Sequence, residues 1–229
     1  NSIKTFKNDE KDRNSLISNK LNHIYADKTD DIIWVATERH GLDAYNYKTH
    51  TYLHFEHNYA SNEENTISAN GITHITSDAL GNLWLATYDS GIDFYDKKNQ
   101  RFINYNQTNV RGLGSNYNWS ILYDSDEKIY VGHIDDGLSI INTKTHTAQN
   151  FRHIPSNPNS LPDNTVSCIF KDSKEQIWVG TRKGLALFNP ENLTFTRFSS
   201  FPGNPSSLSS NYVESIMESS DTMLWIGTE

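Results

Sequence analysis

Cysteine and long apolar runs are scarce in this sequence. Cys168 is the only cysteine among 229 residues, so no intramolecular disulfide can form and cysteine usage does not indicate the compartment. No apolar run approaches the ~20 residues of a membrane-spanning helix, and the first residues lack the pattern of a signal peptide. We therefore expect no membrane contact by this segment. Because the chain begins with Asn1 and not with methionine, we also expect it to be a piece of a longer protein.

Basic residues are outnumbered by acidic ones. Lys and Arg total 20 against 28 Asp and Glu, the net charge is −8 and the pI is about 5.6. An acidic surface repels phosphate backbones, so we expect no nucleic-acid partner. The same charge disfavours anionic membranes and strongly sulfated or carboxylated polymers as ligands, unless a local basic patch overrides it.

Helical periodicity and catalytic signatures are also missing. No stretch of useful length shows an apolar period of 3.6 residues, and the sequence contains no G-x-S-x-G, H-E-x-x-H or P-loop glycine pattern. We therefore expect no catalytic residues, no cofactor and no metal in this segment. Carboxylates are numerous, however, and folding could bring two of them to the spacing that glycosidases use.

One stretch occurs five times, and its clearest copy is S-L-P-D-N-T-V-S-C-I-F-K-D-S-K-E-Q-I-W-V-G-T at Ser160–Thr181. Aligned, the copies share a column of asparagines and a column of aromatic residues: Asn19, Asn70, Asn116, Asn164 and Asn211, and Trp34, Trp84, Tyr130, Trp178 and Trp225. The aromatic residue follows its asparagine by 14 residues in four copies and by 15 in the first, and it recurs in steps of 50, 46, 48 and 47 residues. The repeat units are therefore approximately 14–64, 65–111, 112–158, 159–206 and a truncated 207–229.

Each full unit is predicted to contain four short strands. In the fourth unit they cover about Val166–Lys171, Gln176–Thr181, Leu185–Asn189 and Thr194–Ser199, with an error of roughly 2–4 residues at each boundary. An Asp opens the first turn, where its side chain can accept a hydrogen bond from the backbone N–H two residues on: Asp27, Asp78, Asp124 and Asp172. The segment Ile3–Phe6 matches the last strand of each unit, so residues 1–13 are predicted to hold the last strand of a preceding blade.

This repeat predicts an all-β fold, a β-propeller of four-stranded antiparallel blades. A four-stranded sheet has two apolar faces and buries both only by stacking against like neighbours. The column aromatic would fill the space between blades, and the Gly or Ala beside it would let the sheets approach. Residues 1–229 would then be a single segment of a partial propeller, with four full blades and partial ones at each end. Its end faces would favour self-association, or would be covered by absent neighbouring blades of the parent.

Several polar positions allow a functional and a structural interpretation. The asparagine column could bind sugars, but Asn also hydrogen-bonds local backbone where a loop meets a strand. The segment His54–His57 holds possible metal ligands, although zinc sites need three or four converging ones. The residue before the core Ile of each first strand could line a central channel: His23, His74, Ser120, Cys168 and Ser215. Backbone anchoring and hydrogen-bonded channel lining are the expected roles.

Recognition is expected on loops, because the sheets are committed to packing. The loops between second and third strands vary inside a constant frame, and Trp119 stands where the other copies have Asn22, Thr73, Ser167 and Glu214. Sugars bind to stacking aromatic side chains and planar hydrogen-bonding groups. The candidate ligand-binding residues are Arg39, His40, Tyr88, Asp89, Trp119, His133, Asp135, Asp136, Arg182 and Lys183, and the alternative for each is an ordinary solvated loop residue.

The succession N-S-L-S-x-N, I-x-x-D, L-W-I-G-T and G-L-x-x-[YF] resembles the two-component regulator propeller repeat over essentially the whole chain. Copy three departs from it, with Tyr130 for Trp and His133 for Thr. That family forms the periplasmic sensor region of hybrid two-component systems, best represented in Bacteroidetes, in seven-bladed propellers. The resemblance implies a periplasmic sensing segment of an inner-membrane sensor histidine kinase, with an oligosaccharide as ligand.

Three functions stay open at this point: a ligand-sensing module, a propeller-type carbohydrate-active enzyme (a lyase or glycosidase), and a scaffold that binds protein. A carboxylate pair or a carboxylate–histidine cluster at the axis would favour the enzyme. Aromatic platforms on the loops without such a cluster would favour sensing, and we expect this segment not to be an enzyme.

Overall fold

All regular structure in the described part of the chain is β-strand. The computed structural model describes residues 3–27, 29–60, 65–124 and 127–229. These fall into two compact units, Asn1–Tyr105 and Asn106–Glu229. Within the described ranges there is no helix with the length and apolar character to cross a membrane.

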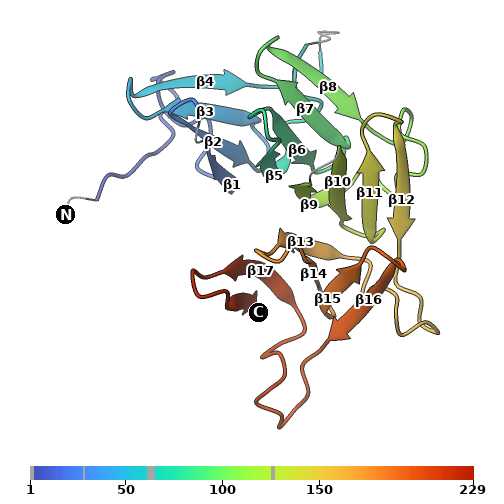
Figure 1. Ribbon diagram of the computed structural model, residues 1–229. Coiled ribbons are helices and arrows are strands. Elements are labelled where there is room, and N and C mark those ends of the chain that lie inside the picture. The colour runs from blue at the N-terminus through green and yellow to red at the C-terminus, as the bar shows by residue number, and fades with distance from the viewer. Residues whose placement is uncertain (1–2, 28, 61–64, 125–126) are drawn as a thin grey trace. The chain divides into compact units, whose positions relative to one another are not determined.

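The first unit consists of two four-stranded antiparallel sheets (Figure 1). The first sheet comprises β1 (Leu21–Ala26), β2 (Ile32–Thr37), β3 (Leu42–Asn46) and β4 (Thr51–Phe55), and the second comprises β5 (Ile72–Ser77), β6 (Leu83–Thr87), β7 (Ile92–Asp96) and β8 (Arg101–Tyr105). In both sheets the strands pair in chain order, so each sheet is a meander joined by short turns.

The second unit holds two more sheets of this kind and a two-stranded sheet. The strands are β9 (Asn118–Tyr123), β10 (Lys128–His133), β11 (Leu138–Asn142) and β12 (Thr147–Phe151); β13 (Val166–Lys171), β14 (Ile177–Thr181), β15 (Gly184–Asn189) and β16 (Thr194–Phe198); and β17 (Val213–Glu218) and β18 (Leu224–Thr228). The predicted units of four short antiparallel strands are confirmed, and the strands of each sheet lie within one sequence repeat.

The turn between the first and second strands forms as its aspartate predicts. The Asp27 carboxylate accepts from the Thr29 N–H at 2.8 Å, and Asp78 accepts from the Leu80 N–H at 2.9 Å. Asp172 does the same for Lys174 at 2.9 Å. For Asp124, the residue two positions on lies outside the described residues.

Every first strand carries a β-bulge one residue after its start. The pairing with the second strand skips one residue in each sheet, and the skipped residues are Asn22, Thr73, Trp119, Ser167 and Glu214. A bulge leaves one residue unpaired and re-aims its side chain. The position that holds Asn, Thr, Trp, Ser and Glu in the five copies is therefore one that the ladder leaves unpaired.

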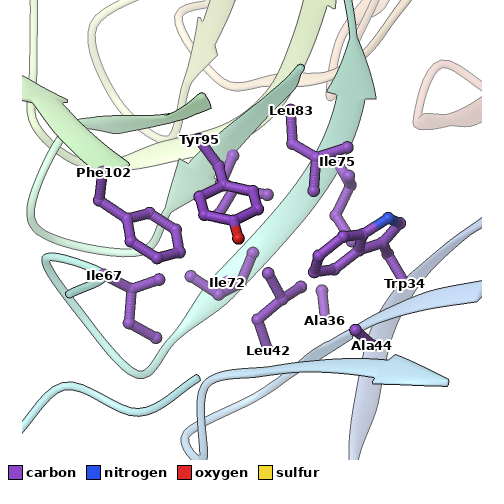
Figure 2. Packing of buried hydrophobic residues seen from close by; sticks show 11 residues of the cluster. Trp34, Ala36, Leu42, Ala44, Ile67, Ile72, Ile75, Leu83, Tyr95 and Phe102 are labelled. Atoms are coloured by element: carbon purple, nitrogen blue, oxygen red, sulfur yellow. The ribbon is translucent and has the colours of Figure 1, made fainter. Parts of the chain in front are cut away.

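The core of the first unit lies between its two sheets (Figure 2). Trp34 of β2 is 2% exposed, and its ring centroid lies 5.9 Å from that of Tyr95 on β7. Phe102 of β8 and Ile72 of β5 belong to the same cluster. The column aromatic therefore fills the space between consecutive sheets, as the repeat predicts.

The second unit repeats this arrangement. Tyr130 of β10 is buried, and its ring centroid lies 6.2 Å from that of Phe188 on β15. A Cβ on Gly132 would come within 2.5 Å of Cγ1 of Val166, which belongs to β13 of the next sheet. The small residue beside the column aromatic is therefore needed because the two sheets approach closely at that point.

Two members of the aromatic column are less buried than the repeat predicts. Trp178 is half-buried, and Trp225 is 58% exposed. Trp178 faces the two-stranded sheet β17–β18, and that sheet covers less of it than a four-stranded neighbour covers Trp34. Burial in this column is therefore supplied by the outer strands of the following sheet, and Trp225 is not a core residue in this structure.

The predicted strand at Ile3–Phe6 is not formed in this structure, where β1 is the first strand. A strand exists only where another strand takes up its backbone groups, and Ile3–Phe6 pairs with none of the strands described here. Phe6 instead packs edge-on against Tyr45, with ring centroids 5.1 Å apart. The assignment of residues 1–13 to a preceding blade stays a prediction.

Candidate functional site

The candidate residues cluster at one edge of each sheet. In the first sheet, Leu21 at the start of β1 pairs with Thr37 at the end of β2, and Leu42 at the start of β3 pairs with Phe55 at the end of β4. The bulge, the loop between second and third strands, and the link to the next sheet therefore meet there. We call this the loop edge, and the same register recurs in the other four-stranded sheets.

A threonine holds the loop at this edge in three of the four-stranded sheets. Thr37 Oγ1 donates to the Gly41 carbonyl at 2.8 Å and accepts from the His40 N–H at 2.9 Å. Thr87 and Thr181 make the equivalent two bonds in their own sheets. This explains the threonine of the W-x-G/A-T motif, whose role the sequence analysis did not assign.

The asparagine column is structural. The side-chain carbonyl of every column asparagine accepts a backbone N–H from the link that precedes it; examples are Asn70 with His57 at 2.6 Å and Asn164 with His153 at 2.7 Å. Asn19, Asn116 and Asn211 bind Asn8, Gln107 and Ser200 in the same manner. The prediction that these asparagines anchor local backbone is confirmed, and their acceptor atoms are engaged by the chain itself.

His133 replaces the loop threonine in the third repeat and is enclosed. Its side chain is fully buried, with Nδ1 2.8 Å from Asn118 Oδ1 and Nε2 2.7 Å from Ser139 Oγ. Burial lowers the pKa of His133 to about 3, so the imidazole is neutral. The interpretation of His133 as a ligand-binding residue is therefore corrected: both ring nitrogens serve the fold.

In the first unit, four candidates lie on two loops. Arg39 and His40 are exposed on the β2–β3 loop, and the Arg39 guanidinium stands 3.8 Å from Glu38. Tyr88, 50% exposed, and the exposed Asp89 lie on the β6–β7 loop. All four are available to a ligand, but surface ion pairs such as Arg39–Glu38 contribute little to order.

In the second unit, the candidates differ in how strongly the chain already binds them. Asp136 is held by Arg152 at 2.7 Å, and Lys183 pairs with Asp163 at 2.9 Å. Asp135 is exposed. These two ion pairs neutralise one acidic and one basic candidate, which leaves Asp135 as the freer charge of the β10–β11 loop.

The aromatic candidates of the second unit lie at the loop edge. Trp119, the bulge residue of β9, is 45% exposed, and Tyr117 two residues earlier is 49% exposed. The Ile134 N–H donates to the Tyr117 carbonyl at 3.0 Å, so the loop that carries Asp135 lies beside them. Arg182 of the β14–β15 loop stands over the Tyr212 ring, 5.5 Å from its centroid. Tyr117 and Tyr212 were missed because the residue after the column asparagine varies too much to mark a site.

Buried polar pairs were also missed by the sequence analysis. Asp93 of β7 accepts hydrogen bonds from the Ser68 N–H at 2.8 Å and Asn104 Nδ2 at 2.9 Å. Asp43 of β3 likewise accepts from the Ile17 N–H at 2.8 Å and contacts His54 Nδ1 at 2.6 Å. Burial raises the pKa of Asp93 to about 6. In the first two repeats these carboxyls tie the preceding link to the sheet.

The histidines considered as metal ligands are engaged in hydrogen bonds. His54 Nε2 lies 2.8 Å from the Arg13 carbonyl while its Nδ1 contacts Asp43, and His57 Nδ1 lies 2.8 Å from the Ile67 carbonyl. Among the residues that the structure describes, no three His, Cys, Asp or Glu side chains group so that they could hold a metal ion.

The residues that precede the core Ile of each first strand are partly buried, and their surroundings differ from sheet to sheet. The rings of His23 and His74 are in contact, with centroids 4.0 Å apart and planes tilted by 43°, and burial lowers the pKa of His23. Cys168 lies close to Gly180, and burial raises the pKa of its thiol to about 12, which makes it unreactive as a nucleophile. These side chains pack between neighbouring first strands.

Comparison with known families identifies the repeat. The family model described as two component regulator propeller matches residues 160–183 and 207–229. The fourth and fifth repeats are two-component regulator propeller repeats. The matched segments are the fourth and fifth copies of the motif, each with the column asparagine, the bulge and the column tryptophan.

The chain as a whole is similar to solved structures of extracellular domains. The extracellular domain of a hybrid two-component system from B. thetaiotaomicron is 32% identical, with a TM-score of 0.75 over 93% of this chain and 33% of that chain. A second such domain from this organism is 20% identical, with a TM-score of 0.70 over 92% of this chain and 28% of that one. These likenesses confirm the β-propeller fold.

A curated relative points to the same class of protein. Histidine kinase P4 of Formosa agariphila is 32% identical over 180 residues, which are 72% of this chain and 12% of that protein. The chain thus spans about an eighth of the curated relative and a third of the first solved structure.

Proposed function

We propose that this chain is a segment of the extracytoplasmic sensor propeller of a hybrid two-component system, and that its loop edge takes part in recognising an oligosaccharide. The observation that carries the proposal is the 32% identity to the extracellular domain of such a system over 93% of the chain. The parent would be a periplasmic-facing inner-membrane sensor histidine kinase.

The arrangement of side chains supports binding rather than catalysis. The exposed groups at the loop edge include aromatic rings, the guanidinium groups of Arg39 and Arg182 and single carboxylates, which suit stacking and hydrogen bonding to a hydroxyl-rich ligand. The buried carboxyls Asp43 and Asp93 serve the links of their repeats through hydrogen bonds to backbone N–H groups. These hydrogen bonds account for two buried carboxyl groups without assigning them a catalytic role.

The test uses the intact sensor region of the parent. A panel of oligosaccharides is titrated by calorimetry, and the same mixtures are analysed for released products. Saturable binding without products supports a sensor. Product release that is lost on replacement of one carboxylate would show a carbohydrate-active enzyme and refute the sensor role. The failure of every oligosaccharide to bind would refute sugar sensing.

A further inference from the structure

In the first and fourth repeats the side chain at the bulge position bonds to the following sheet. Asn22 Nδ2 donates to the Ile72 carbonyl at 2.9 Å, and Ser167 Oγ donates to the Val213 carbonyl. Ile72 and Val213 are the first residues of the following sheet. These two side chains therefore link one first strand to the next, whereas Thr73 Oγ1 at the second bulge donates to the Ala86 carbonyl of its own sheet at 3.1 Å.

Trp119 departs from this task. It occupies the bulge of β9, where the ladder with β10 skips it, and 45% of it is exposed. An indole at this rim buries about half of its surface, so it contributes less to stability than a core tryptophan. A large aromatic face presented by a strand, and not by a mobile loop, is well suited to hold a ligand in one orientation.

Other aromatic and hydrogen-bonding side chains lie beside Trp119 along the loop edge of the second unit. Strand β9 contacts β13, and β13 contacts β17, so three consecutive first strands lie in order. Tyr117 is 49% exposed before β9, and the Arg182 guanidinium is fixed over Tyr212 before β17. Aromatic rings and one fork of N–H donors thus follow one another along the loop edge.

The charges along this edge favour an uncharged ligand. Lys183 is paired with Asp163, which leaves Arg182 as the cation of the β14–β15 loop. Asp135, Glu214 and Glu229 are exposed. Three exposed carboxylates against one guanidinium would repel uronate or sulfate groups, although salt weakens the effect.

We propose that Trp119 is the main stacking residue of an oligosaccharide subsite on the loop edge of the second unit, and that this subsite takes neutral pyranose units. The inference rests on the proposed sensing function and adds its location, its anchor residue and the charge class of its ligand. Arg182 and Tyr117 are expected to contribute hydrogen bonds and a second ring face.

The experiment measures binding of defined probes by calorimetry to the full sensor region. The probes are maltohexaose, xylohexaose and cellohexaose as neutral chains and hexagalacturonate as an acidic one. Variants are Trp119→Asn, which places the bulge residue of the first repeat in the third, and Trp119→Phe, which keeps a ring. Tyr47→Ala is the control, because Tyr47 is 43% exposed and lies in the β3–β4 turn at the opposite end of its sheet.

We expect at least one neutral hexasaccharide to bind, Trp119→Asn to weaken it at least about tenfold, and Trp119→Phe to weaken it less. Tyr47→Ala should bind as the wild type does, and all variants should keep the wild-type circular dichroism spectrum. Unchanged binding in Trp119→Asn would overturn the subsite while sugar sensing stands. Binding of hexagalacturonate alone would overturn the charge class, and binding of none of the four probes would overturn both the subsite and the proposed function.

Discussion

Replacing Trp34 by alanine should lower the free energy of unfolding by about 3–5 kcal/mol, as for other large buried side chains. Trp34 is 2% exposed and packs against Phe55 and Tyr95, with ring centroids 5.8 and 5.9 Å away. A buried tryptophan removes about 150–250 Å² from water, which at about 25 cal/mol per Å² amounts to roughly 4–6 kcal/mol. The alanine side chain is itself buried and retains a small part of this free energy.

Trp225→Ala is the matched variant in the same column. Trp225 is 58% exposed, so less than half of its surface leaves water on folding. Scaling the cost of about 3–5 kcal/mol expected for Trp34→Ala by the buried fraction of Trp225 gives about 1–2 kcal/mol. The half-buried Trp178 should fall between the two. The gap between Trp34 and Trp225 measures what a following sheet contributes, because no sheet among those described follows β17–β18.

The assay is urea unfolding followed by far-UV circular dichroism, because each substitution removes a fluorophore. Two compact units can unfold separately, so hydrogen exchange of amides in β2 and β6 should report the loss in the first unit for Trp34→Ala. Equal costs for Trp34→Ala and Trp225→Ala would refute the view that the next sheet supplies the burial.

Three further outcomes are expected. Because burial raises the pKa of Asp93 to about 6, its stabilising contribution is complete below the unfolded pKa near 4 and is lost as pH rises through 6; Asp93→Asn should remove that dependence, and an unchanged stability–pH curve would contradict it. Burial lowers the pKa of His23, so its contribution is present above about pH 6.5 and is lost as pH falls below it; His23→Gln should flatten that limb of the unfolding curve, and a limb of the same slope would contradict this. The isolated 26.2 kDa chain should associate through exposed faces such as that of Trp225, which light scattering would detect; a monomer at high concentration would count against it.

The repeat made most of the fold predictable. Strand β13 has the predicted bounds, and β14, β15 and β16 differ from prediction by one residue at an end. The first turns follow their aspartates, and the asparagine column binds backbone as expected. Local rules of pairing, turn chemistry and side-chain alternation act within a few residues, so one repeat carries them and five copies reinforce them.

The candidate site was predictable as a region and less so as residues. The varying loop positions do gather at the loop edge. His133 belonged to the same varying set, yet it is enclosed between Asn118 and Ser139. Tyr117 and Tyr212, which add exposed or cation-facing rings, had no repeat pattern to mark them.

The sequence by itself determined the period, the strand type and the residues that join links to strands, because these depend on contacts within one repeat. Only the tertiary structure decided which column aromatics are buried, since Trp34 and Trp178 carry the same motif, but a four-stranded sheet follows Trp34 and the two-stranded β17–β18 follows Trp178. It also decided that the bulge frees Trp119 from the ladder, because the strand register places an unpaired residue there and motif alignment does not record pairing.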